Sequence, residues 1–499
     1  MLTKKRLLNN AAFSAIQTVV SAVLLFFLYR FLLKQLGAEQ LGIWAIVLAS
    51  TSVGRLTDMG LAGAIVKFVA NSNATGQVEK SSRLVQTAAL TIGTALAVLA
   101  LLALPLLHLL LQWVLPTTAI SPAMEILPYA IASLFFTMIS GIFQSGIDAC
   151  HRMDVKNIIL VSCNIIYIAI TVFLVPRHGL LGIAIAQTIQ SILLVCSSWL
   201  VLKRLIPTLP ILPYHWHKAE FREMLGYATN FQIGMLAGMF FDPVTKFFLA
   251  KYGNLSQTAY YEMANQLLQK ARSVIVSAQQ ALVPEIAGGK FSDQKDLTAL
   301  YQKSYGISFL LVLPYYIGIA LALPLVSILW IGHYEPFFVV YGAIASVGWF
   351  AANLSAVPYF FNIGTGALTW NTANHILNGL INITLGAILG YYFSGIGVVF
   401  AAACALTMPN LMLIQVVNKR LGLGSLAIVP LGQRTYLLLI IMGAAIAIAG
   451  GFALRGHSIT IGVAAAPSII FATIALLTIN FNPTGKSIFN KVLKFRSKN

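Results

Sequence analysis

Long apolar segments follow one another along the whole chain and are separated by short polar connections. A helix that spans a bilayer needs about 20 mainly apolar residues, and the pattern contains about fourteen such segments. The connections are too short to fold a soluble catalytic domain. The sequence therefore predicts an all-α polytopic membrane protein with helices over residues 9–33, 41–68, 84–114, 124–149, 157–176, 179–202, 225–250, 257–284, 304–331, 337–362, 372–393, 396–418, 435–453 and 459–480.

Composition and charge agree with this prediction. Only 9% of the 499 residues are charged and the mean hydropathy is +0.83, whereas soluble domains carry about 25% charged residues. The net charge of +18 does not indicate nucleic acid, because basic residues accumulate in the cytoplasmic loops of membrane proteins. The four cysteines show no metal-site or disulfide spacing.

The placement of the basic residues predicts an orientation. If the N-terminus is cytoplasmic, about 22 Lys and Arg side chains fall in inside loops and about four in outside loops. The bias holds from loop to loop, so we expect both termini in the cytoplasm and an even number of spans.

Two sequence echoes indicate an internal repeat. Residues 30–37 resemble residues 246–253, and residues 179–186 resemble residues 394–401. Both echoes pair each helix with the helix six places later, as in transporters built from repeated halves. We therefore expect six plus six plus two helices, with the halves related by an axis along the membrane normal. The predicted parts are an N-terminal lobe (1–205), a cytoplasmic linker (206–224), a C-terminal lobe (225–420), and two further helices with a basic tail (421–499).

Ionisable side chains at membrane depth cost several kcal/mol and mark functional sites. They concentrate in the first, second, seventh and eighth predicted helices, which the repeat relates as two pairs. We expect these helices to face each other across a polar cavity. The side chains are Arg30, Arg55, Asp58, Asp242, Lys246, Glu262, Lys270 and Arg272.

The eighth helix carries a polar stripe. Its members recur at offsets that fall within a narrow arc at 100° per residue, and Lys270 and Arg272 flank the arc near the middle of the span. Arg55 has an equivalent depth when counted from the matching glycine, so both halves present bases to the cavity. The stripe comprises Glu262, Gln266, Gln269, Ser273, Ser277 and Gln280.

Several of these side chains have structural alternatives. Arg30 and Lys246 lie near the outer ends of their helices and could reach the headgroups. Asp242 and Lys246 could form an ion pair at a helix break beside Pro243. Arg55 and Asp58 could pair at i, i+3.

A cavity with surplus bases suits an anion such as a diphosphate. Gln266, Gln269 and Ser273 supply hydrogen-bonding groups of the kind that sugars use. The carriers for a coupling proton or cation are Asp58, Asp242 and Glu262, and Glu262 is preferred because no base lies within one turn of it. No metal site or cofactor is expected.

Short glycine-based motifs add a family resemblance over nearly the whole chain. The segments 36–42 (LGAEQLG), 58–63 (DMGLAG) and 176–182 (PRHGLLG), together with the helix layout, resemble the polysaccharide-transporter branch of the multidrug/oligosaccharidyl-lipid/polysaccharide (MOP) flippase superfamily. The nearest likeness is the Wzx-type O-antigen flippases.

The resemblance implies a V-shaped pair of six-helix lobes that rock between inward-open and outward-open forms, and no enzymatic activity. The implied substrate is an undecaprenyl-diphosphate-linked oligosaccharide, an O-antigen (lipopolysaccharide) or exopolysaccharide repeat unit, which crosses the bacterial inner membrane among membrane lipids. The coupling ion would be H⁺ or Na⁺. The family's cationic cavity maps onto Arg55, Lys270 and Arg272, and less securely onto Arg30 and Lys246.

Three other functions remain open at this point. A cation-coupled drug exporter of the same superfamily should show acids rather than bases in its cavity. A lipid II flippase would also have a basic cavity, although the first helix here carries few bases. A polytopic glycosyltransferase or polymerase needs a large outer loop with acids or histidines, and the predicted outer loops 115–123 and 251–256 contain neither.

Overall fold

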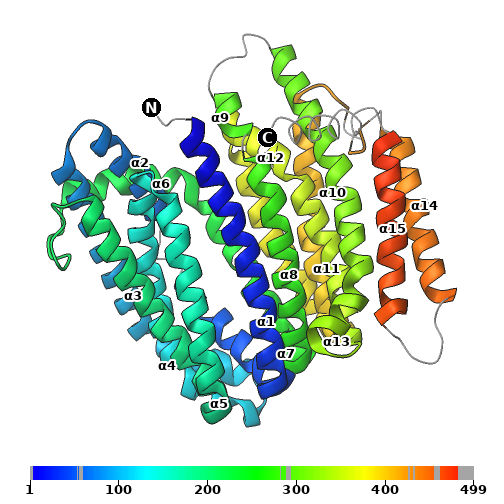
Figure 1. Cartoon of the computed structure of the whole chain (residues 1–499), viewed down its shortest axis with the longest axis horizontal. Coiled ribbons are helices and arrows are strands. Elements are labelled where there is room, and N and C mark those ends of the chain that lie inside the picture. The colour runs from blue at the N-terminus through cyan, green and yellow to red at the C-terminus, as the bar shows by residue number, and fades with distance from the viewer. Residues whose placement is uncertain are drawn as a thin grey trace. The chain divides into compact units, whose positions relative to one another are not determined.

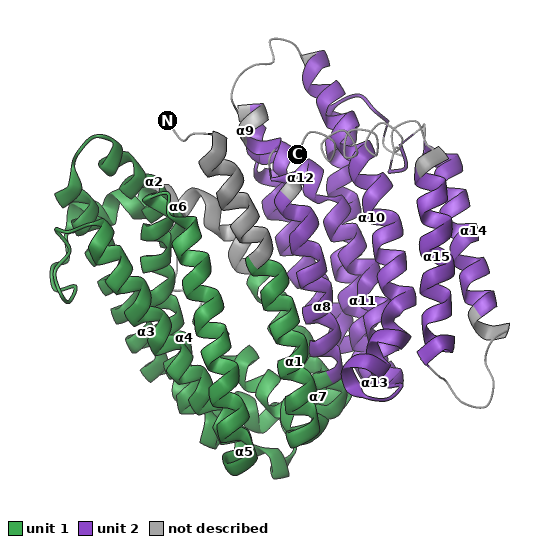
Figure 2. Cartoon of the chain, in the orientation of Figure 1, with its two compact units in different colours: residues 1–259 green, residues 260–499 purple. Residues whose placement is uncertain are grey.

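The computed structural model describes residues 4–52, 54, 60–280, 282–287, 294–424, 428–430, 433–453 and 461–481, and within them it shows helices and short connections without a strand. The chain divides into two compact units, residues 1–259 and 260–499 (Figure 2). This division falls after the predicted linker 206–224, so the predicted lobe boundaries stay a prediction.

The described helices follow one another in the order shown in Figure 1. In unit 1 they are α1 (Lys4–Thr51), α2 (Leu61–Ala74), α3 (Val78–Val114), α4 (Thr117–Ala149), α5 (Met153–Leu205), α6 (Lys218–Met239) and α7 (Phe241–Tyr252). Helix α8 (Leu255–Gln279) begins at the end of unit 1. It is followed by α9 (Leu282–Ala287), α10 (Gln294–Ile331), α11 (Pro336–Leu354), α12 (Ala356–Thr365), α13 (Thr369–Arg420), α14 (Arg434–Ala453) and α15 (Ile461–Phe481).

Each predicted span coincides with helix, which confirms the all-α polytopic fold. Among the residues that the structure describes, eight helical segments are long and apolar enough to cross a membrane, and some of them contain two predicted spans. The chain is a multi-pass membrane protein. Four predicted spans are each covered by two helices instead of one: 41–68 by α1 and α2, 225–250 by α6 and α7, 257–284 by α8 and α9, and 337–362 by α11 and α12. The division lies at Phe240 between α6 and α7 and at Ser355 between α11 and α12.

The two longest helices are hairpins with equivalent turns. Helix α5 has one non-helical residue, Gly179 (φ 54°, ψ −131°), and α13 has one, Ser394 (φ 55°, ψ −145°). Polar contacts between the arms show that they run antiparallel, because Gln190 Nε2 donates to Asn164 Oδ1 at 2.7 Å within α5. The predicted echo between residues 179–186 and 394–401 is therefore a repeated backbone turn.

A glycine three residues after each turn allows the arms to approach closely. A Cβ atom at Gly182 would lie 2.8 Å from the Leu174 carbonyl oxygen, and one at Gly397 would lie 2.0 Å from the Leu389 carbonyl oxygen. The spacing of eight residues is the same in both hairpins, so the glycines serve one packing role twice.

Unit 1 has two apolar cores. One gathers buried residues such as Leu32, Ile46 and Leu111 from α1 and α3, together with residues of α4, α5 and α7. The other joins α2, α3, α4 and α5 around residues such as Ile65 and Ile147. Helix α1 changes direction at Gly37 (φ 78°, ψ 169°), a conformation that glycine adopts without a steric penalty.

The core of unit 2 is rich in aromatic side chains. Tyr301 and Tyr305 of α10 stack with their ring centroids 5.8 Å apart, and Tyr301 also meets the ring of Phe361. The buried Phe471 of α15 joins the same core. Helices α14 and α15 pack on each other and α15 packs on α10, so the two C-terminal helices belong to this unit.

Candidate functional site

The predicted site residues divide among three regions of the chain. Arg30 is exposed on α1, and Arg55 and Asp58 lie outside the described residues. Asp242 and Lys246 lie on α7. The other predicted residues, Glu262, Gln266, Gln269, Lys270, Arg272 and Ser273, lie on α8.

Asp242 and Lys246 form an ion pair at the start of α7. Lys246 Nζ lies 2.5 Å from Asp242 Oδ2, and the lysine is buried. Asp242 occupies the first turn of the helix, where a negative charge also interacts favourably with the helix dipole. The geometry agrees with the structural alternative for this pair, in which the charge of Lys246 is largely compensated within α7.

The polar stripe of α8 is held by hydrogen bonds along its own helix. Gln266 Nε2 donates to Glu262 Oε1 at 2.9 Å. Ser273 and Ser277 donate to the Lys270 and Ser273 carbonyl oxygens. Glu262 is buried, whereas Gln266, Gln269, Lys270 and Ser273 are half-buried.

Arg272 lies in an aromatic cage within unit 2. Its guanidinium lies 5.6 Å from the ring centroid of Trp349 on α11, and the Trp349 indole N–H donates to Asn265 Oδ1 at 2.9 Å, which fixes the ring. The Tyr316 and Tyr359 hydroxyl groups are close enough to interact with its charge. The cage therefore consists of Trp349, Tyr316 and Tyr359.

No acid compensates the charge of Arg272 among the residues that the structure describes. None of the salt bridges formed by these residues involves Arg272, and its Nε atom is buried without a hydrogen-bond partner. An aromatic cage stabilises a cation only partly. The side chain is therefore a half-buried base that retains the capacity to bind an anion.

A network of buried polar side chains reaches Tyr316, one of the aromatic side chains beside this base. Gln279 Nε2 donates to Ser308 Oγ and to the Asn353 carbonyl oxygen, at 2.8 and 3.2 Å. Asn353 Nδ2 in turn donates to Tyr316 Oη at 3.3 Å. The network thus connects α8, α10 and α11 beside the cage.

A second part of the network crosses the hairpin of α13. Asn410 Oδ1 accepts hydrogen bonds from Asn374 Nδ2, at 3.2 Å, and from Ser355 Oγ. Asn410 Nδ2 donates to the Leu406 carbonyl oxygen. Asn410 therefore joins both arms of α13 to the break between α11 and α12.

The sequence analysis missed the asparagines of α13 because it followed ionisable side chains. The signal was present, because the asparagines recur at offsets of 0, 3, 7 and 11 on an apolar helix and so share one face. All of them are buried in the structure. They are Asn371, Asn374, Asn378 and Asn382.

Several polar atoms of this region have no partner in the protein. The Oδ1 atoms of Asn353, Asn374 and Asn378 and the Nε2 atom of His375 are buried without a hydrogen bond. Such atoms need water or a ligand to satisfy them. His375 lies against the Tyr359 ring at 5.7 Å between centroids, so the unsatisfied atoms continue from the cage along α13.

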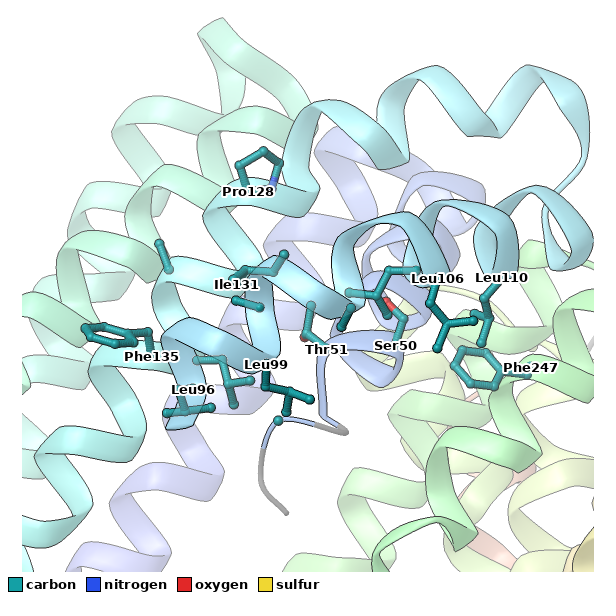
Figure 3. Close-up of a pocket in the computed structure, with 16 residues that line it drawn as sticks. Ser50, Thr51, Leu96, Leu99, Leu106, Leu110, Pro128, Ile131, Phe135 and Phe247 are labelled. Atoms are coloured by element: carbon teal, nitrogen blue, oxygen red, sulfur yellow. The ribbon is translucent and has the colours of Figure 1, made fainter. Parts of the chain in front are cut away.

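Unit 1 contains a cavity of the opposite character (Figure 3). It has a volume of about 310 Å³ and lies among α1, α3, α4 and α7, with walls that include Leu96, Phe135 and Phe247. The Ser50 and Thr51 hydroxyls in its wall donate to carbonyl oxygens of their own helix. The cavity therefore presents apolar surface, which suits hydrocarbon rather than a charged or sugar group.

The family comparison identifies the chain from its sequence. The model of the family described as "Polysaccharide biosynthesis protein" matches residues 7–289, which is more than half of the chain. None of the curated protein sequences matches it.

Solved structures of transporters share the fold. An inward-facing multidrug resistance MATE family transporter of the MOP superfamily aligns with a TM-score of 0.66 and 14% identity, over 80% of this chain and 94% of its own. The lipid II flippase MurJ, in an inward closed conformation, aligns with a TM-score of 0.65 and 14% identity, over 94% and 99% of the two chains. A MOP superfamily transporter from Pyrococcus furiosus aligns with a TM-score of 0.54 and 13% identity, over 83% and 95%.

These matches cover most of the chain, and they are membrane transporters and flippases rather than enzymes. With the match to residues 7–289, they show that the chain belongs to the polysaccharide biosynthesis protein family and has the fold of MOP superfamily transporters.

Proposed function

We propose that this flippase moves a polyprenyl-diphosphate-linked oligosaccharide across the bacterial inner membrane by alternating access, with undecaprenyl diphosphate as the lipid carrier. One observation carries the proposal, namely the half-buried Arg272, whose buried Nε atom has no hydrogen-bond partner and whose charge has no compensating acid among the described residues. A diphosphate needs such a base, because its charge loses the stabilisation of water at membrane depth.

The chemistry around Arg272 fits a lipid-linked sugar. The half-buried Lys270, Gln266 and Gln269 of α8 offer a second base and amide groups on the same helix. The Trp349 ring supplies a flat apolar face of the kind that packs on sugar rings. In this proposal Lys270 and Arg272 bind the diphosphate, while Gln266, Gln269 and Ser273 bind the glycan.

The bases outside unit 2 have supporting roles in the proposal. Arg55 binds the diphosphate from the other half of the repeat. Arg30 is exposed and Lys246 is ion-paired, so we assign them to earlier or later stages of substrate passage. The carriers of coupling H⁺ or Na⁺ are Glu262, Asp58 and Asp242, with Glu262 preferred.

The proposal includes an orientation and a pathway. In the proposal both termini are cytoplasmic, which the distribution of basic loops supports, and the glycan moves from the cytoplasmic leaflet to the outer leaflet. Its source is an O-antigen or exopolysaccharide repeat unit, as in lipopolysaccharide biosynthesis. The family match to a polysaccharide biosynthesis protein supports this choice over drug export.

Complementation of a flippase-deficient strain tests the proposal. Arg272→Ala should slow glycan export on the order of 100-fold, because an unpaired charge at membrane depth costs roughly 3 kcal/mol. Arg272→Lys should retain part of the activity, because the charge remains but the bidentate contact is lost.

Arg177→Ala is the matched control for Arg272→Ala. Arg177 also lies over an aromatic ring, with its guanidinium 3.9 Å from the Phe173 centroid, but it is exposed. Its removal should leave export unchanged. Full complementation by Arg272→Ala at normal membrane abundance would overturn the proposal.

A further inference from the structure

The connection between α5 and α6, residues 206–217, follows α3 instead of forming a free loop (Figure 1). We call it the α5–α6 linker. Near its start, Thr208 Oγ1 donates to the Val78 carbonyl oxygen and Ser82 Oγ donates to the Thr208 carbonyl oxygen, both at 3.2 Å. The linker is thereby fixed to the first turns of α3.

The second half of the linker is fixed further along α3. The backbone N–H groups of Tyr214 and His215 both donate to Gln86 Oε1 at 3.4 Å. The Trp216 indole N–H donates to Thr91 Oγ1 at 3.0 Å. These bonds satisfy polar groups of the linker with side chains of α3.

These contacts place Trp216 beside the apolar part of α3, beyond the basic residues at the start of that helix. Thr91 follows Val78, the first residue of α3, by 13 residues, which corresponds to about 20 Å along a helix. It lies about 12 Å beyond Arg83, the last basic residue of this end of the helix. The linker therefore ascends from the polar end of α3 toward the hydrocarbon region.

The linker exposes large apolar side chains at this depth. The exposed fractions are 76% for Ile211, 71% for Leu212, 65% for Tyr214 and 48% for Trp216. Four such side chains within six residues would be unfavourable in water. Trp and Tyr are typical of the membrane interface, where an apolar ring and a polar N–H or O–H group are both accommodated.

Bases flank the apolar side chains on both sides. They are Lys203 and Arg204 in the last turn of α5, and Lys218 and Arg222 in α6. None of the four forms a salt bridge with another residue that the structure describes.

The bases at the start of α3, by contrast, form salt bridges. Lys80 pairs with Glu223 and Arg83 pairs with Glu220. The four bases beside the linker therefore keep a net positive charge, whereas those of α3 are compensated.

We propose that the α5–α6 linker and its four flanking bases bind anionic phospholipids of the cytoplasmic leaflet. The apolar side chains enter the boundary between headgroups and acyl chains, and Lys203, Arg204, Lys218 and Arg222 contact the lipid phosphates. Apolar burial combined with basic residues is how interfacial segments bind anionic membranes. This contact anchors unit 1 to the leaflet and does not depend on the transported substrate.

Tryptophan quenching by brominated phosphatidylcholine tests the depth of the linker. The difference in emission between the unaltered protein and Trp216→Phe isolates Trp216. Bromine near the headgroup end of the acyl chain should quench the Trp216 emission at least twice as strongly as bromine at the chain end. Quenching by aqueous acrylamide and by neither lipid would overturn the proposal.

A cysteine at Ile211 provides a second measurement in case Trp216→Phe folds poorly. A polarity-sensitive fluorophore attached there should shift its emission to the blue when detergent is replaced by vesicles. The same fluorophore at Arg204, a base beside the linker, should shift less. Equal emission from both positions in vesicles would contradict insertion of the apolar side chains.

The choice of anionic lipid is tested with a matched pair of double variants. Lys218→Gln with Arg222→Gln should weaken the retention of phosphatidylglycerol about 25-fold, at roughly fivefold for each base. Lys419→Gln with Arg420→Gln removes the same charges from the exposed end of α13 and should change it much less. Equal losses in both variants, or none in the first, would overturn the proposal.

Discussion

Ser394 has a backbone conformation that glycine favours, with φ 55° and ψ −145°. A non-glycine residue in this region carries a cost on the order of 1–3 kcal/mol. Ser394→Gly should therefore raise the free energy of unfolding by about 1 kcal/mol, measured as a higher midpoint of thermal unfolding in detergent. Gly179 occupies the same turn in the other half, so Gly179→Ser should lower the midpoint. A shift of the same sign in both variants would contradict the equivalence of the two turns.

Asn410 is the residue on which both arms of the α13 hairpin depend. Asn410→Leu should lower the free energy of unfolding by roughly 2–3 kcal/mol, because the buried Asn374 loses its acceptor and Ser355 keeps only the Ala352 carbonyl oxygen. Thr384→Val is the control, since Thr384 is exposed and donates only to its own helix, and it should change the free energy by less than about 0.5 kcal/mol. Similar values for both would argue against the network.

Single residues also show where prediction from the sequence failed. Arg272 was predicted as a cavity base, and in the structure it is a half-buried base that pairs with no acid among the described residues. Trp349 and Tyr359, which surround it, lie more than 70 residues further along the chain. Neither charge nor helical spacing within α8 contains that information, because tertiary packing alone brings the rings to the base.

Gly42 of α1 lies close to the backbone at the first residue of α8. A Cβ atom at this position would lie 2.0 Å from the Leu255 carbonyl oxygen. Gly42→Ala should therefore separate the two backbones and lower the midpoint of thermal unfolding. Gly63→Ala on α2, where nothing lies within 4 Å, should instead raise the free energy of unfolding by about 0.5–1 kcal/mol. Stabilisation by both substitutions would show that the close contact is absent in the membrane.

The polar stripe of α8 predicts a pattern of chemical accessibility. Single cysteines at Gln266, Gln269 and Ser273, in a background without the native cysteines, should react with a membrane-impermeant thiol reagent. Cysteines at Leu268, which is fully buried, and at Val274, which is 57% exposed on an apolar face, should not react, because the reagent requires water. Equal labelling of both sets would mean that the stripe is a packing seam.

The helices could be predicted from the sequence more fully than the breaks and turns between them. The apolar windows coincide with helix where the structure describes them, because a spanning helix must be long and apolar whatever its neighbours are. The number of fourteen spans stays a prediction. The break at Ser355 was not predicted, since it is held by Asn410 from another helix. The turn at Gly179 was predicted only as a boundary between two helices, although the sequence echo with residues 394–401 pointed to its repetition.

In the proposed function the whole molecule couples glycan movement to an ion gradient, and Glu262 is the proposed carrier. Transport by the unaltered protein in vesicles should respond to a proton or sodium gradient. Glu262→Gln should remove this response and keep gradient-independent exchange, because the amide preserves the contact with Gln266 but cannot change its charge. The same gradient dependence in both proteins would assign coupling to another group.

Translocation in proteoliposomes tests the central claim most directly. A polyprenyl-diphosphate-linked glycan with a fluorescent label is reconstituted in both leaflets, and a membrane-impermeant reductant bleaches the label outside. The account predicts that the unaltered protein makes the label of the inner leaflet accessible to the reductant. Vesicles with Arg272→Gln should bleach no further than protein-free vesicles. A labelled glycolipid without phosphate should stay in the inner leaflet even with the unaltered protein. Equally fast movement of the phosphate-free glycolipid, or undiminished movement with Arg272→Gln, would contradict it.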